Sequence, residues 1–466
     1  MCRLRRTIFD DPDYLRALFK LAFPIALQML LVSSLNMIDT VMIGRLGEVP
    51  IAAVALANQV FFLLLLFLFG VGSGAGVFAA QYWGTRDKAG VQRTLGISIL
   101  GGSIGAVFFY CAAAFVPEQV IAIYSRDTAV ITLSASYLRM VAPSYFFTAV
   151  TIVFSSVIRS TGSTKLPLFV TAISLLINTL LNLVLIFGLL GFPAMGVRGA
   201  ALATAIARSI EATLLILLAY ARHEPAVGTL RNYLSWNAAF IKRFWATASP
   251  VVLNEIGWSL GVTVYVLVYA RMGTEVVAAF NIADTVIRLS FVVFMGTANA
   301  ALILTGNQIG AGELERASVG ARRILAITPL MGAAAGLALV AAAPLVPLLF
   351  EITPEARRIV TQFLLISGFV VPVKVSNLHI VVGLLRGGGD TRYSLFMDVG
   401  ILWLVGVPLV AFAGLVLGLA PPLVFLCTIF EELVKYVLGL RRILSDRWVH
   451  QVTEHAQQSL PMVPQE

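Results

Sequence analysis

The chain is poor in charged residues. Only 12% of its 466 residues are Asp, Glu, Lys or Arg, whereas 59% are hydrophobic and the mean hydropathy is +0.91. About a quarter of the residues in a soluble protein are charged, so this composition excludes a water-soluble globular domain. Apolar stretches of 18 or more residues recur along the chain, and each is long enough to cross a hydrocarbon layer of ~30 Å as a helix. The sequence therefore predicts an all-α integral membrane protein.

Cysteine and histidine are also scarce. The three cysteines have neither metal-binding nor redox spacing, which excludes a disulfide framework. With four histidines, no HExxH and no Walker-type phosphate loop, the sequence offers no basis for zinc catalysis or ATP hydrolysis. Gly257-Trp-Ser-Leu-Gly261 matches the nucleophile-elbow pattern, but it falls in an apolar helix rather than at a strand–turn–helix junction. We therefore expect no catalytic residues and no cofactor, and an ion gradient is the remaining energy source.

Twelve membrane spans are expected, at 14–45, 50–82, 94–116, 128–158, 166–190, 196–221, 244–271, 276–308, 324–350, 356–385, 393–416 and 420–440. Most of the 33 basic residues lie in connections on the side of the N-terminus. The opposite side holds only Arg45, Arg126, Arg198, Arg271, Arg357 and Arg358. Because basic residues accumulate on the cytoplasmic side, we expect a multi-pass protein of the cell membrane with both termini cytoplasmic. The net charge of +9 then reflects topology, so the expected surroundings are a lipid bilayer and not a nucleic acid.

The chain contains an internal repeat. An offset of 226 residues places Pro24 on Pro250 and Arg45-Leu46-Gly47 on Arg271-Met272-Gly273, and an offset of 227 places Arg159–Thr164 on Arg386–Thr391. Each half has an even number of spans, so we expect two six-helix bundles related by a pseudo-twofold axis along the membrane normal. The predicted domains are an N-lobe (1–222), a cytoplasmic linker (223–241), a C-lobe (242–445) and a polar, disordered tail (446–466).

Ionisable residues within spans are the candidate functional groups, because a charge in the hydrocarbon layer costs several kcal/mol, roughly 2.5–3.5 on insertion scales. Asp39 in the first span has no opposite charge at helical spacing. Asn178 and Asn182 lie one turn apart in the fifth span, and Thr204 follows in the sixth. These four residues form the predicted ion-coupling site, and the only metal expected is a sodium ion at Asp39 and Asn178.

The second half offers a different set of candidates for ion or substrate binding: Glu255, Asp284, Lys374 and Asp398. Asp284 has Arg288 at i+4, so a neutral pair on one helix face is an equal alternative. Lys374 has no acid beside it in sequence, and we expect it to pair with one of the other three across the bundle. Glu431, Glu432 and Lys435 near the end of the last span are interpreted as interfacial.

The sequence resembles the multidrug and toxic compound extrusion (MATE) family over residues 15–442. The resemblance is carried by Pro24, Asp39–Gly47, Ala79–Gly84, Arg159–Thr164, Asn178 with Asn182–Gly188, and Gly196–Thr204. It implies a monomeric exporter whose two six-helix lobes alternate access and exchange cationic, amphipathic compounds for protons or sodium ions. The family's N-lobe site corresponds to Asp39, Asn178 and Thr204, and Asn182 stands where some relatives have an aspartate. Glu255 lies about one turn earlier than the seventh-helix glutamate of NorM-type members.

These observations favour a secondary-active multidrug exporter. One alternative is a flippase for lipid-linked oligosaccharides, which would need a cationic cavity for pyrophosphate; it requires Lys374, Arg139 and Arg208 to line one cavity unpaired. Alternatives of another class are a membrane-embedded enzyme and a channel.

Overall fold

The computed structural model describes residues 12–453, and within them the chain is helical, with a single isolated β-bridge between Gly389 and Val449. The first half contains six spans. They are α2 (Pro12–Gly44), α3 (Glu48–Gly84), α4 (Lys88–Phe115), the pair α6 (Thr128–Val141) and α7 (Ser144–Ser160), α8 (Lys165–Phe187) and α9 (Val197–Ala221). The pair α6 and α7 is one span bent by 57°. A short helix, α5 (Pro117–Ala122), precedes it.

The second half also contains six spans. They are α11 (Ala238–Met272), α12 (Thr274–Gly310), α13 (Leu314–Ala342), α14 (Pro354–Leu378) with the π-helix η2 (His379–Leu385), the segment Thr391–Val416, and α17 (Pro421–Leu444). The segment Thr391–Val416 alternates α15 (Thr391–Leu395) and α16 (Val407–Ala411) with the π-helices η3 (Phe396–Gly400), η4 (Leu402–Gly406) and η5 (Phe412–Val416). A 3-10 turn, η1 (Val346–Leu349), follows α13.

The expected twelve spans are confirmed. Ten described helices are long and apolar enough to cross a membrane, and the bent pair α6 and α7 adds one more. The twelfth, α17, has 24 residues, but Glu431, Glu432 and Lys435 lower its hydropathy. The largest difference in boundaries is at the ninth span, expected at 324–350: α13 begins ten residues earlier, in a basic stretch that still forms helix, and ends before Pro344 and Pro347.

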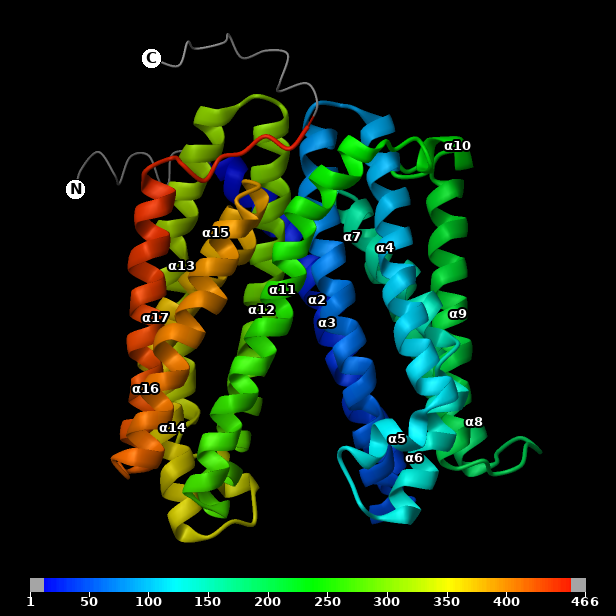
Figure 1. The fold of residues 1–466 in the computed structure, drawn as a ribbon, viewed down its shortest axis with the longest axis vertical. Coiled ribbons are helices and arrows are strands. Elements are labelled where there is room, and N and C mark those ends of the chain that lie inside the picture. Colours follow the sequence, from blue (N-terminus) through cyan, green and yellow to red (C-terminus); the bar gives the residue numbers. More distant parts are fainter. Residues whose placement is uncertain (1–11, 454–466) are drawn as a thin grey trace. The chain divides into compact units, whose positions relative to one another are not determined.

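By internal packing the chain forms two compact units. We call residues Leu27–Ala79 and Asp87–Val252 the N-terminal unit. The C-terminal unit consists of the residues up to Ala26, Ala80–Arg86, and the residues from Leu253 onward. In the N-terminal unit α4 packs on α7 and α8 packs on α9, and in the C-terminal unit α13, α14 and α17 run side by side (Figure 1). The predicted division into lobes at 222 and 242 is based on the internal sequence repeat, and it stays a prediction.

The predicted linker packs against the N-terminal unit. Its short helix α10 (Leu230–Tyr233) lies beside α4 (Figure 1). Gln92 of α4 donates to the carbonyl oxygen of Val227 (2.6 Å) and accepts from the side chain of Asn232 (2.7 Å). The linker is therefore fixed to the beginning of α4 by side-chain hydrogen bonds.

The expectation of a disordered tail is wrong for its first residues. Trp448 is completely buried, and its Nε1–H donates to the carbonyl oxygen of Ile443 (3.1 Å). Gln81 at the end of α3 donates to the carbonyl oxygen of His450 (3.0 Å) and accepts from the backbone N–H of Val452 (2.8 Å). Most residues of the predicted tail are polar, but one buried tryptophan and one buried glutamine hold its first residues against the unit. Residues 454–466 lie outside the described residues.

Asp390 joins this segment to the turn before α15, outside the spans. Arg442 Nε donates to Asp390 Oδ2 (2.8 Å), and His450 Nε2 lies 3.6 Å from Asp390 Oδ1. Burial alone would raise the pKa of the Asp390 carboxyl, but the hydrogen bonds from His450 and Arg442, with the Arg442 charge, outweigh it and hold the pKa below its ordinary range.

A carboxyl with a lowered pKa stabilises the fold above its unfolded-state pKa of ~3.9, and the stabilisation is lost as the pH falls through the folded-state value. Replacing Asp390 by Asn should therefore lower the melting temperature of the purified protein in detergent at pH 7, by an amount equivalent to about 1–3 kcal/mol. The difference from the unsubstituted protein should shrink in acid. An equal difference at all pH values would contradict an ionic role for Asp390.

Candidate functional site

The four residues of the predicted N-terminal ion site lie together in one hydrogen-bonded chain. Asn182 Nδ2 on α8 donates to Asp39 Oδ1 on α2 (2.7 Å) and to Asn178 Oδ1 (3.1 Å). Asn178 Nδ2 in turn approaches Thr204 Oγ1 on α9 at 3.5 Å. Tyr137 of α6 shares a hydrogen bond with Thr204. Four helices of the N-terminal unit thus meet around one carboxylate.

One oxygen among these hydrogen-bonded side chains has no donor. Asn182 is 1% exposed, and among the residues described its Oδ1 has no hydrogen-bond partner. A buried acceptor without a partner costs about 1–3 kcal/mol. Carboxylate, amide and hydroxyl oxygens are the ligands that hard cations prefer. The group therefore suits either a proton on Asp39 or a small cation between Asp39 and the amide oxygens.

Close packing of α8 and α9 brings these side chains into reach. Gly199 near the start of α9 lies against the backbone of α8, where a Cβ atom would stand 2.4 Å from the carbonyl oxygen of Leu185. Any larger residue would push α9 away from α8. Because Thr204 is on α9 and Asn178 on α8, the contact between them depends on this glycine.

In the same unit, a second row of hydrogen-bonded side chains includes an acid that neutralises Arg208. Arg208 Nη1 lies 2.8 Å from Glu211 Oε2, and Thr171 Oγ1 donates to Glu211 Oε1 (2.9 Å). Gln28 Nε2 donates to Thr171 Oγ1 at 2.9 Å. The Arg208 charge also acts on Asp39. Asp39 is therefore the carboxylate of this region without an ion pair of its own among the described residues.

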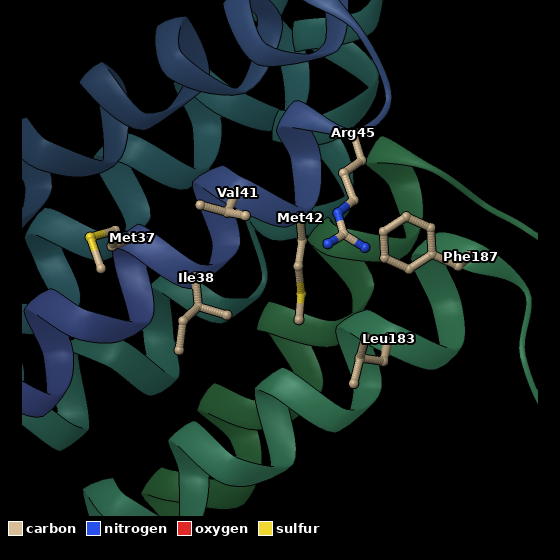
Figure 2. Close-up of a pocket in the computed structure, with 7 residues that line it drawn as sticks. All are labelled: Met37, Ile38, Val41, Met42, Arg45, Leu183 and Phe187. Atoms are coloured by element: carbon tan, nitrogen blue, oxygen red, sulfur yellow. The ribbon is translucent and has the colours of Figure 1, made fainter. Parts of the chain in front are cut away.

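An apolar pocket of about 250 Å³ lies on the same stretch of α2 and α8 as the bond between Asp39 and Asn182. Met42 extends from α2 toward Leu183 and Phe187 of α8, with Arg45 at the end where Phe187 lies (Figure 2). The remaining lining residues are Met37, Ile38 and Val41. Methionine and aromatic side chains adapt to apolar ligands of varied shape.

In the C-terminal unit, two of the four candidates form partly buried ion pairs. Glu255 Oε1 lies 2.7 Å from Nη2 of Arg386, a residue with 1% of its surface exposed. Asp398 accepts from Asn254 Nδ2 (2.9 Å) and from Lys435 Nζ (3.0 Å). Both acids are thus held by bases that lie far away in sequence.

The expected partner of Lys374 is wrong. Glu255, Asp284 and Asp398 are paired with other bases, and no described residue forms an ion pair with Lys374. Asp284 pairs with Arg288 at 2.5 Å on a partly exposed face of α12, as its i+4 spacing indicates.

The interfacial interpretation of the last helix is also wrong. Glu431 and Lys435 are each 3% exposed, and Lys435 Nζ lies 2.5 Å from Glu431 Oε1. Tyr265 of α11 donates a short hydrogen bond to Glu431 Oε2. Lys435 therefore bridges two carboxylates inside the unit. Their i+4 spacing was visible in the sequence, but Asp398, the third member, is 37 residues away.

The requirement of the flippase alternative is not met. Arg139 is half-exposed and lies 2.8 Å from Glu118, and Arg208 is paired with Glu211. Of the three bases that would have to line one cavity, only Lys374 lacks an ion pair among the described residues.

Comparison with known proteins identifies the family. The MatE family model matches residues 24–184 and again 250–412, so both halves match one model and the internal repeat is confirmed. The transporter YisQ of Bacillus subtilis is 26% identical over 93% of this chain and 95% of its own length. A probable multidrug resistance protein NorM of Deinococcus radiodurans is 29% identical over 87% and 89%.

Solved structures share the fold. The Vibrio cholerae MATE transporter VcmN superposes with a TM-score of 0.84 at 17% identity, covering 93% of this chain and 98% of that one. A MOP-superfamily transporter from Pyrococcus furiosus gives 0.83 at 20% identity, covering 95% and 98%. The chain belongs to the MATE family and is a multi-pass membrane transporter, not an enzyme.

Proposed function

We propose that the chain is a secondary-active exporter that exchanges cationic, amphipathic small molecules for protons or sodium ions. The observation that carries the proposal is the hydrogen bond between Asp39 and Asn182, next to an amide oxygen that lacks a donor among residues 12–453. An unpaired carboxylate in a membrane span is retained for binding an ion or a substrate. Here it has ligands for a cation and, within the described part of the chain, no ion pair of its own.

The substrate class follows from the surroundings of this carboxylate. The apolar pocket with Met42 and Phe187 would take the hydrophobic part of a ligand, and a carboxylate nearby favours a positive charge. Several relatives are named as probable multidrug resistance proteins, which supports export of small molecules of more than one kind.

The exchange cycle requires two states with different affinities. Binding of a cation at Asp39 changes the hydrogen bonds to Asn182 and Asn178, and it drives transport only if the ion and the substrate prefer different states. We propose that these states are the two access states of an N-lobe (1–222) and a C-lobe (242–445), in a cell membrane with both termini in the cytoplasm.

Reconstituted liposomes test the proposal. With purified protein and ethidium as the probe, an imposed gradient of protons or of sodium ions should drive ethidium against its own gradient, and an ionophore that collapses the ion gradient should stop it. Ion flux without ethidium countertransport would indicate a channel instead. Ethidium movement that ignores both gradients would remove the antiport proposal.

A further inference from the structure

In the C-terminal unit, the residue at the repeat position of Asp39 is a tyrosine, and a carboxylate on another helix faces it. Tyr265 follows Asp39 by 226 residues, which is the offset of the repeat. Its hydroxyl contacts Glu431 on α17. In the N-terminal unit the acid is on the first helix of the repeat, whereas in the C-terminal unit a hydroxyl stands there and the acid is on a facing helix.

The surrounding contacts correspond as well. Offsets of 226, 227 and 224 residues relate three pairs of positions: Gln28 and Asn254, Thr171 and Asp398, Glu211 and Lys435. The last offset is the one that separates the starts of α9 and α17. In each unit the first residue donates to the second, and the second contacts the third. The two units thus build one network on the same positions, but the third residue is an acid in one and a base in the other.

The C-terminal network has one more acid than bases. Lys435 is the single base between Asp398 and Glu431, while Glu255 and Arg386 balance each other. Glu432, the next acid on α17, accepts from Asn377 of α14. Lys374, one turn before Asn377, is the base of this end of α14, since Arg357 and Arg358 lie at the other end of the helix. The count therefore stays at one excess negative charge. His379 is not counted with this network, because its ring nitrogens contact Thr297 and the carbonyl oxygen of Val375 rather than these acids.

A second observation points to missing positive charge at the same place. Asn254 is 2% exposed, and in the described part of the chain its Oδ1 finds no donor, although its Nδ2 binds Asp398. A buried carbonyl oxygen beside a carboxylate favours a positively charged or proton-bearing group nearby. Asp398 itself lies in the π-helix η3, and π-helical turns in membrane and soluble helices concentrate at functional sites.

The chemistry of the neighbours decides which acid takes the proton. Asp398 faces an amide N–H and an ammonium, both of which can only donate, so its carboxylate is favoured. Glu431 also contacts the Lys435 ammonium through Oε1, but its other oxygen, Oε2, faces the hydroxyl of Tyr265, which can donate to a carboxylate or accept from a carboxylic acid. Glu431 therefore has a neighbour that can accept its proton, whereas both neighbours of Asp398 can only donate. Gly406 of η4 makes room for this contact, since a Cβ there would meet both side chains. Protonated Glu431 would leave Asp398 and Lys435 as a neutral pair.

We infer that Glu431 is a second proton-exchange site of this transporter, formed with Tyr265, Lys435 and Asp398 in the C-terminal unit. One proton from water adds to the Glu431 carboxylate and gives a carboxylic acid hydrogen-bonded to Tyr265, and its departure restores the excess negative charge. The inference rests on the proposed exchange of cations for substrate, because the proton is given up in that cycle.

Infrared spectroscopy of purified protein with 13C-labelled glutamate side chains tests the site directly. Exposed glutamates are ionised above about pH 6, so a labelled carboxylic-acid C=O band in that range reports a buried protonated glutamate. We expect such a band in the unsubstituted protein and its loss in Glu431→Gln. It should also be lost in Asp398→Asn, because Lys435 then pairs with Glu431 alone. Tyr265→Phe should keep the band and shift its frequency.

Glu118→Gln is the matched control, since Glu118 pairs with Arg139 in a half-exposed bridge of the other unit, and it should leave the band unchanged. A band that survives in Glu431→Gln, or that follows sodium and not pH, overturns the inference. Survival in Asp398→Asn overturns the charge argument. Tyr265→Phe keeps the test valid if Glu431→Gln fails to fold. The infrared measurement does not depend on transport. A missing band therefore contradicts this inference, whereas the antiport proposal is contradicted only by the liposome assay.

Discussion

Replacing Asp39 by Asn should strongly lower gradient-driven efflux while leaving the amount of folded protein unchanged. Asparagine has the shape of aspartate and can still accept the hydrogen bond from Asn182, so the contact between α2 and α8 survives. What disappears is the ionisable group, and with it the coupling between ion and substrate. A coupling free energy of about 1–3 kcal/mol corresponds to a ~5–150-fold change in affinity, and we expect efflux to fall within that range.

The measurement is efflux of ethidium from cells and from liposomes with imposed proton or sodium gradients. Asp446→Asn is a suitable control, because Asp446 pairs with Arg322 in a half-exposed bridge beyond the last span. Efflux by Asp39→Asn that equals the unsubstituted rate, with the same dependence on pH and sodium, would remove Asp39 from the mechanism.

Replacing Lys435 by Met should destabilise the protein more than any other single change considered in the C-terminal unit. Lys435 bridges Glu431 and Asp398 at 2.5 and 3.0 Å, and its removal leaves the buried Glu431 and the partly buried Asp398 without their base. Breaking a buried ion pair from one side costs about 3–5 kcal/mol. We therefore expect a large loss of monodisperse protein in detergent and a lower melting temperature in what remains.

A compensated variant separates charge from packing. Lys435→Met combined with Glu431→Gln and Asp398→Asn carries no buried charge at these positions and should recover most of the lost stability. If the triple variant melts no higher than Lys435→Met, or if Lys435→Met melts like the unsubstituted protein, the bridge is not what stabilises this region.

The helices were accessible from the sequence because membrane spans are specified locally. Each span needs a run of apolar residues, and a run is read without knowing its neighbours. The exceptions have local causes too: α13 begins in a basic stretch that still forms helix, and α17 carries more charge than a hydropathy test allows. Trp448 was missed because a single aromatic side chain in a polar tail has no pattern around it.

The partners within the sites were less accessible, since they depend on tertiary contacts. Asp39 and Asn182 are 143 residues apart. We predicted that they share a site because Asn178 and Asn182 are one helical turn apart and because the family resemblance includes these positions. Glu255 and Arg386 are 131 residues apart with no comparable signal. Lys374 was assigned a partner because it lacked one in sequence, but its candidate partners already had nearer bases in space.

The charges of α17 bear on how the chain is made. A helix with Glu431, Glu432 and Lys435 along its length enters lipid at a cost of roughly 2.5–3.5 kcal/mol per central charge, so its own hydrophobicity does not secure it in the bilayer. The groups that offset this cost, Tyr265 and Asp398, are on segments synthesised earlier. The last span is therefore retained by docking onto helices already inserted. Membrane integration of this protein ends with a tertiary folding step.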